Sequence, residues 1–213
     1  MLLELSRLEV PPGQRVLLRN VSWDEFEIIL EELGEKRAAR VAYNRGMLEI
    51  MTPLPEHERS KENIGDLIKI LFEEFDIDFS PLGSTTFKNQ LMLQGVEPDN
   101  CFYIQNEALI RAKTRIDLTI DPPPDLALEV DVTSRTNREI YQRLGVPELW
   151  RFERDKLQIN ILINSLYVET EFSPYFPNIP LTQVIPQHLY KLKTESKNKT
   201  MREFRSWVKE QII

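Results

Sequence analysis

Three carboxylates at alternate positions of one short stretch have the spacing of a metal-binding strand. Residues 125–132 read Asp-Leu-Ala-Leu-Glu-Val-Asp-Val, so the even positions are apolar and the odd positions include Asp125, Glu129 and Asp131. This alternation predicts a β-strand, in which side chains two residues apart share a face at a spacing of about 7 Å. Acids on one face of a buried strand repel each other and are costly to desolvate. A divalent cation with oxygen ligands would offset that cost.

The same alternation also fits an edge strand whose acidic face is solvated. Three prolines at 122–124 precede the stretch, and the apolar residues Val146, Leu149 and Trp150 follow it after a short predicted helix. These neighbours favour an interior strand. We therefore expect Leu126, Leu128 and Val130 to be buried.

A second Pro-Asp pair predicts a partner for the acidic strand. Pro98-Asp99 precedes the apolar run 101–104, as Pro124-Asp125 precedes the acidic stretch. If the two strands are neighbours, Asp99 lies close to Glu129, and such a pair can hold Mg²⁺ or Mn²⁺ beside water molecules. The metal would neutralise a phosphodiester and lower the pKa of the attacking water. Many nucleases add a lysine two residues after the glutamate, but Asp131 stands there in this chain.

Two further residues could support such a site. Glu49 lies in the predicted strand 47–51, where its neighbours Leu48 and Ile50 are apolar, so it points to the opposite face. His57 stands at the start of the predicted amphipathic helix 57–75. It is either an exposed polar residue near a helix start or a site residue that points back at the sheet.

Composition limits the class of protein. The chain has 213 residues, a formal net charge of −7 and one cysteine, Cys101. The acidic charge opposes non-specific nucleic-acid binding at long range but leaves room for a local basic groove. The N-terminus lacks the apolar core of a signal peptide, and no apolar run approaches the roughly 20 residues of a membrane helix. We expect a soluble cytoplasmic protein without membrane contact.

The elements expected along the chain suggest three parts. We expect an N-terminal arm over 1–20, a core domain over 21–165, and a C-terminal wrap and helix over 166–213 packed on that core. Within the core, Ser22 and Glu25 form a capping box that predicts a helix over 23–33. The further predicted elements are strands 38–43, 47–51, 148–152 and 157–163, a helix over 137–144, a proline-rich surface segment over 173–193 and a basic amphipathic helix over 200–211. The last helix packs on the domain through Phe204 and Trp207, or contacts nucleic acid.

Three blocks of the sequence carry a family resemblance. These are LEIMTPLPEHE (48–58), LGSTTFKNQLMLQGVEPDNCFYIQNEA (82–108) and DLTIDPPPDLALEVDVT (117–133), the last followed by YQRLGVPELWRFE. They closely resemble the Uma2-type family of restriction-endonuclease-like proteins, in the form abundant in cyanobacteria, over roughly 20–163. The resemblance implies a mixed α/β (α+β) fold, with a central mixed sheet flanked by helices.

The resemblance also implies a nuclease site. The Pro-Asp acid falls on Asp99, the strand glutamate on Glu129 with Asp125 at the strand entry, and the histidine after the proline-rich turn on His57. The hairpin acid of many members is missing from 41–46, and Glu49 is the nearest substitute. The lysine that many members supply from the following helix aligns with Asn137.

Arginine could replace the positive charge of that lysine. Arg135 or Arg138 lies close in sequence, and arginine holds a phosphate bidentately although it is a poor proton acceptor. The expected catalytic set is therefore Asp99, Glu129, Asp131 and Arg138, with Mg²⁺ or Mn²⁺ on Asp99, Glu129 and Asp125.

Two hypotheses about function follow. The leading one is a metal-dependent DNA endonuclease with weakened activity, acting as a homodimer. The alternative is a non-catalytic protein on the same fold that binds metal or nucleic acid, or serves as a scaffold.

Overall fold

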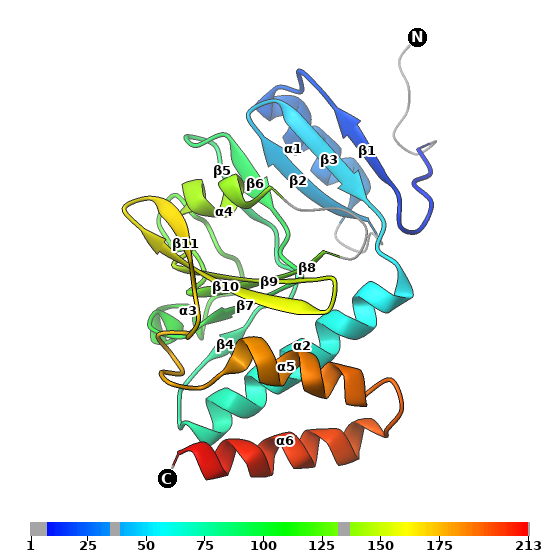
Figure 1. Cartoon of the computed structure of the whole chain (residues 1–213). Coiled ribbons are helices and arrows are strands. Elements are labelled where there is room, and N and C mark those ends of the chain that lie inside the picture. The colour runs from blue at the N-terminus through cyan, green and yellow to red at the C-terminus, as the bar shows by residue number, and fades with distance from the viewer. Residues whose placement is uncertain (1–7, 35–38, 132–136, 213) are drawn as a thin grey trace.

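Two β-sheets form the centre of the molecule in a computed structural model that describes residues 8–34, 39–131 and 137–212 (Figure 1). The first, sheet A, is antiparallel and runs in the order β1 (Arg15–Leu18), β3 (Met47–Met51), β2 (Arg40–Asn44), β6 (Gln94–Val96) and β5 (Phe87–Asn89). The second, sheet B, runs in the order β11 (Leu166–Thr170), β10 (Lys156–Ile163), β9 (Glu148–Glu153), β8 (Leu126–Asp131), β7 (Asn100–Tyr103) and β4 (Ser80–Pro81).

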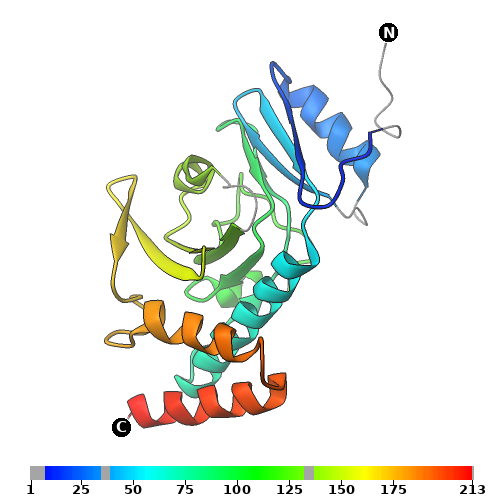
Figure 2. The same cartoon turned by 45° about the vertical axis from the view of Figure 1, so that its right-hand side comes forward.

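Helices cover both sheets (Figures 1 and 2). The described helices are α1 (Trp23–Leu33), α2 (Pro55–Glu74), α3 (Glu107–Ile110), α4 (Arg138–Leu144), α5 (Leu181–Lys191) and α6 (Lys197–Gln211). Helix α1 packs on sheet A, α2 and α5 pack on one face of sheet B, and α6 lies against α2. Helix α4 packs between the other face of sheet B and β6.

The acidic stretch forms an interior strand of a mixed sheet, which confirms the expected fold class. Strand β8 pairs antiparallel with β7 and parallel with β9. Leu126, Leu128 and Val130 are buried, as the alternation predicts. The solvated edge-strand interpretation is therefore wrong.

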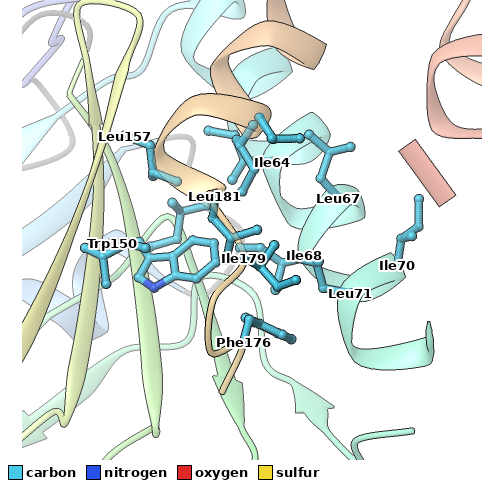
Figure 3. Packing of buried hydrophobic residues seen from close by; sticks show 14 of the residues in the cluster. Ile64, Leu67, Ile68, Ile70, Leu71, Trp150, Leu157, Phe176, Ile179 and Leu181 are labelled. Atoms are coloured by element: carbon cyan, nitrogen blue, oxygen red, sulfur yellow. The ribbon is translucent and has the colours of Figure 1, made fainter. Parts of the chain in front are cut away.

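The largest apolar cluster fills the space between sheet B and the helices α2 and α5 (Figure 3). It contains the even-numbered residues of β8, one face of α2 and the ring of Trp150. Burying each large apolar side chain there stabilises the fold by about 1.5–3 kcal/mol. This packing fixes β8 and α2 relative to each other, and these two elements carry Glu129 and His57.

Helix α1 shows how local sequence sets an element that tertiary packing then fixes. The Ser22 hydroxyl accepts a hydrogen bond from the Glu25 N–H (3.2 Å), and the Ser22 N–H donates to the Glu25 carboxylate (2.7 Å), so the predicted capping box is present. The ring of Phe26 then lies over Gly95 of β6. A Cβ at Gly95 would come 2.8 Å from Phe26 Cζ, which is closer than real contacts allow.

The C-terminal region differs from expectation in one element. Residues 181–191, predicted to be part of a proline-rich surface segment, form helix α5 with Pro186 inside it. The helix buries Leu181 and Ile185 completely in the main core, and this burial outweighs the backbone hydrogen bond that proline cannot donate. The tail helix is as expected, with Phe204 buried and Trp207 half-buried and stacked on it at 5.9 Å between ring centroids.

At the N-terminal end, part of the expected arm joins a sheet. Residues 15–18 form β1, which pairs antiparallel with β3 so that Leu17 faces Glu49. This pairing places Arg15 close enough to Glu49 for an ion pair of 3.0 Å.

Candidate active site

Asp99 and Glu129 lie at neighbouring positions of adjacent strands. Asn100 of β7 is paired with Leu128 of β8 in the antiparallel register. Asp99 precedes Asn100 and Glu129 follows Leu128, so the register brings the two acids to the same level. Their exposed fractions are only 2% and 4%, and the N–H of Val130 donates a 2.6 Å hydrogen bond to Asp99 Oδ2.

A cation and an imidazole share the Asp99 carboxylate. Arg40 of β2 makes an ion pair with Asp99 Oδ1 through Nη1, and His57 Nε2 lies 3.1 Å from Asp99 Oδ2. The structure thus places His57 against the sheet, buried to 3% exposure, and not on the exposed surface of helix α2. Burial and, less strongly, the charge of Arg40 lower the pKa of His57 to about 4, although Glu58 acts in the opposite direction. The imidazole is therefore neutral near pH 7, with Nε2 facing Asp99 and Nδ1 lying 3.3 Å from Glu58 Oε1.

Glu58 links the site to a second cation. Its Oε1 accepts from Arg40 Nη2 at 2.9 Å, and its Oε2 accepts from Lys61 Nζ at 2.9 Å. The side chains of Arg40 and Lys61 are each 12% exposed, whereas that of Glu58 is 41% exposed. The Glu58 carboxylate therefore binds two cations, one of which, Arg40, also contacts Asp99.

Each remaining acid of the site has its own partner. The hydroxyl of Tyr141 donates to Glu129 Oε1, and burial raises the pKa of Tyr141, so this hydroxyl stays protonated. Arg151 lies opposite Glu129 on the parallel strand β9, and its Nε donates to Asp131 Oδ2 at 3.0 Å. Both members of this pair are buried, so Asp131 and Arg151 form a buried ion pair.

Glu49 faces the same region from sheet A. The pKa of Glu49 is raised, mainly by burial. The charge of Arg15 opposes this shift, and the charge of Asp131 adds to it. The structure therefore brings Glu49 within electrostatic reach of Asp131, from the opposite sheet.

Asp125 has a different set of partners. Its Oδ2 accepts from the backbone N–H groups of Ile104 (2.7 Å) and Asn106 (3.1 Å), and its Oδ1 accepts from the Asn106 side-chain amide (2.9 Å). These bonds hold the loop between β7 and α3. Within the parts of the chain that the structure describes, no three His, Cys, Asp or Glu side chains gather as a metal-binding group.

Arg138, one of the two arginines expected to replace the missing lysine, lies on the surface of helix α4. Asn137 caps helix α4 by accepting from the Glu139 N–H at 3.0 Å, and Arg138 is exposed in the first turn of that helix. Arg135 lies outside the described residues.

Four residues of the site were not singled out from the sequence: Arg40, Lys61, Tyr141 and Arg151. Lys61 stands four residues after His57 in a helix, so the spacing that aligns one face would have found it. Strand alternation similarly places Arg151 on the face of Leu149. No local pattern points to Arg40 or Tyr141, because each reaches its acid from a distant element.

The donor set fits a small divalent cation. Asp99 and Glu129 offer oxygen ligands, the type that Mg²⁺ and Mn²⁺ prefer. Asp99 is paired with Arg40 and Glu129 accepts from the Tyr141 hydroxyl, so a bound metal would share or replace these contacts. Asp99 and Glu129 are the residues that would hold such a cation.

The mixed sheet flanked by helices is of the restriction-endonuclease-like class of folds. The crystal structure of "a putative nuclease belonging to DUF820" from Anabaena variabilis is similar, with a TM-score of 0.54 over 88% of this chain and 99% of that one. The identity is 12%, so this likeness concerns the fold alone. The model of the Uma2 family, described as "Putative restriction endonuclease", matches residues 23–193, and the chain belongs to this family.

Two further searches found no match. No curated protein sequence matches the chain. Among the described residues, no helix is both long enough and apolar enough to cross a membrane.

Proposed function

We propose that this protein is a metal-dependent endonuclease that hydrolyses phosphodiester bonds of DNA. The observation that carries the proposal is the buried pair of Asp99 and Glu129 on neighbouring strands of the mixed sheet. Two carboxylates at one level are costly to desolvate, and oxygen ligands of this kind suit Mg²⁺ or Mn²⁺. Membership of the Uma2 family supports the same class of activity.

The residues around the pair would orient it for hydrolysis. The Val130 N–H and His57 hold the Asp99 carboxylate, and the Tyr141 hydroxyl holds that of Glu129. When bound, the metal would neutralise charge on the phosphate and lower the pKa of the attacking water. Attack of the water on phosphorus breaks one P–O bond, and the products are a phosphate monoester and a free hydroxyl group.

One observation favours a second candidate function, non-catalytic binding of nucleic acid. Asp131 stands where many nucleases have a lysine that positions the water, and its charge is neutralised by Arg151. A site without that lysine would bind metal and substrate but lack a group to position the water. The two candidates share the acid pair and differ only in turnover.

Plasmid cleavage combined with thermal unfolding separates them. Wild type is expected to nick supercoiled DNA with Mn²⁺ more strongly than with Mg²⁺, and EDTA should abolish nicking. A ligand that binds only the folded state stabilises it, so Mn²⁺ should also raise the melting temperature. Glu129→Gln should lose both effects, whereas Glu169→Gln, an exposed acid of β11, should keep them.

Each outcome of this comparison has one meaning. A melting shift without nicking under any metal would support the non-catalytic candidate. Nicking by Glu129→Gln at the wild-type rate would refute the acid pair as the active site.

A further inference from the structure

We propose that Arg40 and Lys61 form the phosphate-binding end of a nucleic-acid groove that leads to Asp99. This inference rests on the proposed nuclease function and names the part of the chain that would hold the DNA backbone. Its starting point is that two cations, held by one carboxylate, line a large groove beside the buried acid pair.

The groove is larger than a small-molecule site. Its volume is about 1410 Å³, compared with roughly 300–1,000 Å³ for typical ligand pockets. It lies between helix α1, the start of α2, and the loops around 84–88 and 114–116. Polar and charged residues form much of its wall, among them Thr52, Ser84, Thr85, Thr86, Thr114 and Arg115.

The chemistry of this wall suits a phosphate backbone. Hydroxyl, lysine and arginine side chains are the usual donors to phosphate oxygens. The described residues that line the groove include no aromatic side chain, so the wall offers no platform for base stacking. We therefore expect binding that depends on salt and is insensitive to base sequence.

Arg40 connects the groove to the acid pair, because it lines the groove and contacts Asp99. The guanidinium of Arg40 contacts both Asp99 and Glu58, and Lys61 contacts the other oxygen of Glu58. Arginine holds a phosphate with a planar fork of donors, and lysine adds a compact charge. A phosphodiester held by both cations would lie next to Asp99, where hydrolysis is proposed.

Arg40 and Lys61 would supply the positive charge that many nucleases obtain from the lysine two residues after the glutamate. Arg138, the substitute suggested by the sequence, is exposed on α4 and is not among the residues that line the groove. Arg40 and Lys61 are instead largely buried, and Arg40 contacts Asp99 while Lys61 shares Glu58 with Arg40.

Four acids also line the groove, and three of them have identified partners. Glu27 pairs with Lys88, and Glu58 holds Arg40 and Lys61. Glu97 is buried and accepts from the Val41 N–H (3.1 Å) and the Thr86 hydroxyl (2.5 Å). The fourth is Glu31. Among the groove acids, Glu58 is thus the one that a phosphate would compete with for both cations. Outside the groove lining, Asp99 pairs with Arg40, and Glu62 lies 3.7 Å from Lys61.

Binding measured without metal tests this inference independently of catalysis. The probe is a fluorescein-labelled duplex 20-mer, with the matching single strand as a second arm, and anisotropy is recorded in EDTA over a series of salt concentrations. Each lost phosphate contact should lower duplex affinity about five- to tenfold at 0.1 M salt and the salt slope by about 0.9. We expect these losses for Arg40→Gln, Lys61→Gln and the groove variant Arg115→Gln.

Glu58→Gln gives a test of opposite sign. Removing the carboxylate that competes for both cations should tighten binding, whereas a merely structural role for Glu58 would weaken it. Lys209→Gln, on the exposed surface of α6, is the matched control and should bind as wild type does. Arg40→Gln leaves Asp99 without its cation, so its melting curve is recorded, and Lys61→Gln decides the question if that variant unfolds.

The outcomes distinguish failure of this inference from failure of the proposed function. Groove-dependent binding without cleavage under any metal would support the groove and refute the nuclease. Cleavage by wild type with unchanged binding in Lys61→Gln and Arg115→Gln would refute the groove. A loss of affinity in Arg138→Ala, with none in the groove variants, would assign phosphate binding to α4 and also overturn the inference.

Discussion

The two faces of strand β8 differ in polarity: one is apolar, and the other carries buried acids. On one face, Leu128 and Val130 join an apolar cluster that reaches α2 and α5. On the other, Glu129 and Asp131 are nearly as deeply buried, but Tyr141 and Arg151 contact them. The apolar face needs only shape and area to be stable, whereas the charged face needs a partner for each acid. A strand can therefore carry a reactive site at its centre only if distant elements bring those partners.

Glu148 shows what happens when an acid lies among apolar neighbours. It is buried at the start of β9, where the indole N–H of Trp150 donates to it and no cation pairs with it among the described residues. Burial raises the pKa of Glu148 to about 7, although the hydrogen bond from Trp150 opposes this. Asp131, by contrast, has the guanidinium of Arg151 beside it.

The largest expected effect comes from breaking the buried ion pair. Arg151→Met leaves Asp131 charged and buried without its cation, and the expected loss is about 4 kcal/mol of unfolding free energy in urea denaturation. The double variant Arg151→Met with Asp131→Leu removes both charges and should recover most of that loss. If the single variant loses less than about 1 kcal/mol, the pair is solvated and the contrast between the faces is wrong.

A cavity on the apolar face should cost somewhat less. Leu128→Ala removes a fully buried side chain from the main cluster, and such truncations cost about 3 kcal/mol. The matched control is Leu166→Ala on the edge strand β11, where the side chain is 62% exposed and the change should stay within about 0.5 kcal/mol. Equal losses at both positions would mean that β8 is not the centre of the core.

The smallest effect is the pH dependence that Glu148 adds. Because its pKa is raised in the folded state from 4.5 to about 7, the folded protein binds more protons between these values. Unfolding free energy therefore falls as pH rises through this window, by about 2 kcal/mol between pH 5 and pH 8. Glu148→Gln should remove this contribution, and Glu171→Gln, an exposed acid, should not. Parallel stability profiles for wild type and Glu148→Gln would contradict the assignment.

Local sequence determined much of the fold. The period-2 alternation of 125–132 predicted a buried strand because apolar side chains at every second position need a shared core. The capping box at Ser22 and Glu25 predicted the start of α1 because it satisfies orphan N–H groups within one turn. The repeated Pro-Asp pair predicted that Asp99 lies close to Glu129 if the two strands are neighbours, and the register shows that they are neighbours.

Only the tertiary structure decided which partner each acid receives. Arg40 reaches Asp99 from sheet A, Tyr141 reaches Glu129 from α4, and Arg151 reaches Asp131 from β9. Asp125 looks like another acid of the same strand, yet loop geometry turns its oxygens to Asn106. Alternation and capping act over a few residues, whereas ion pairs and hydrogen bonds between elements depend on how sheets and helices pack. The acids of the candidate site could therefore be predicted from the sequence, whereas packing between distant elements determined the partner of each acid.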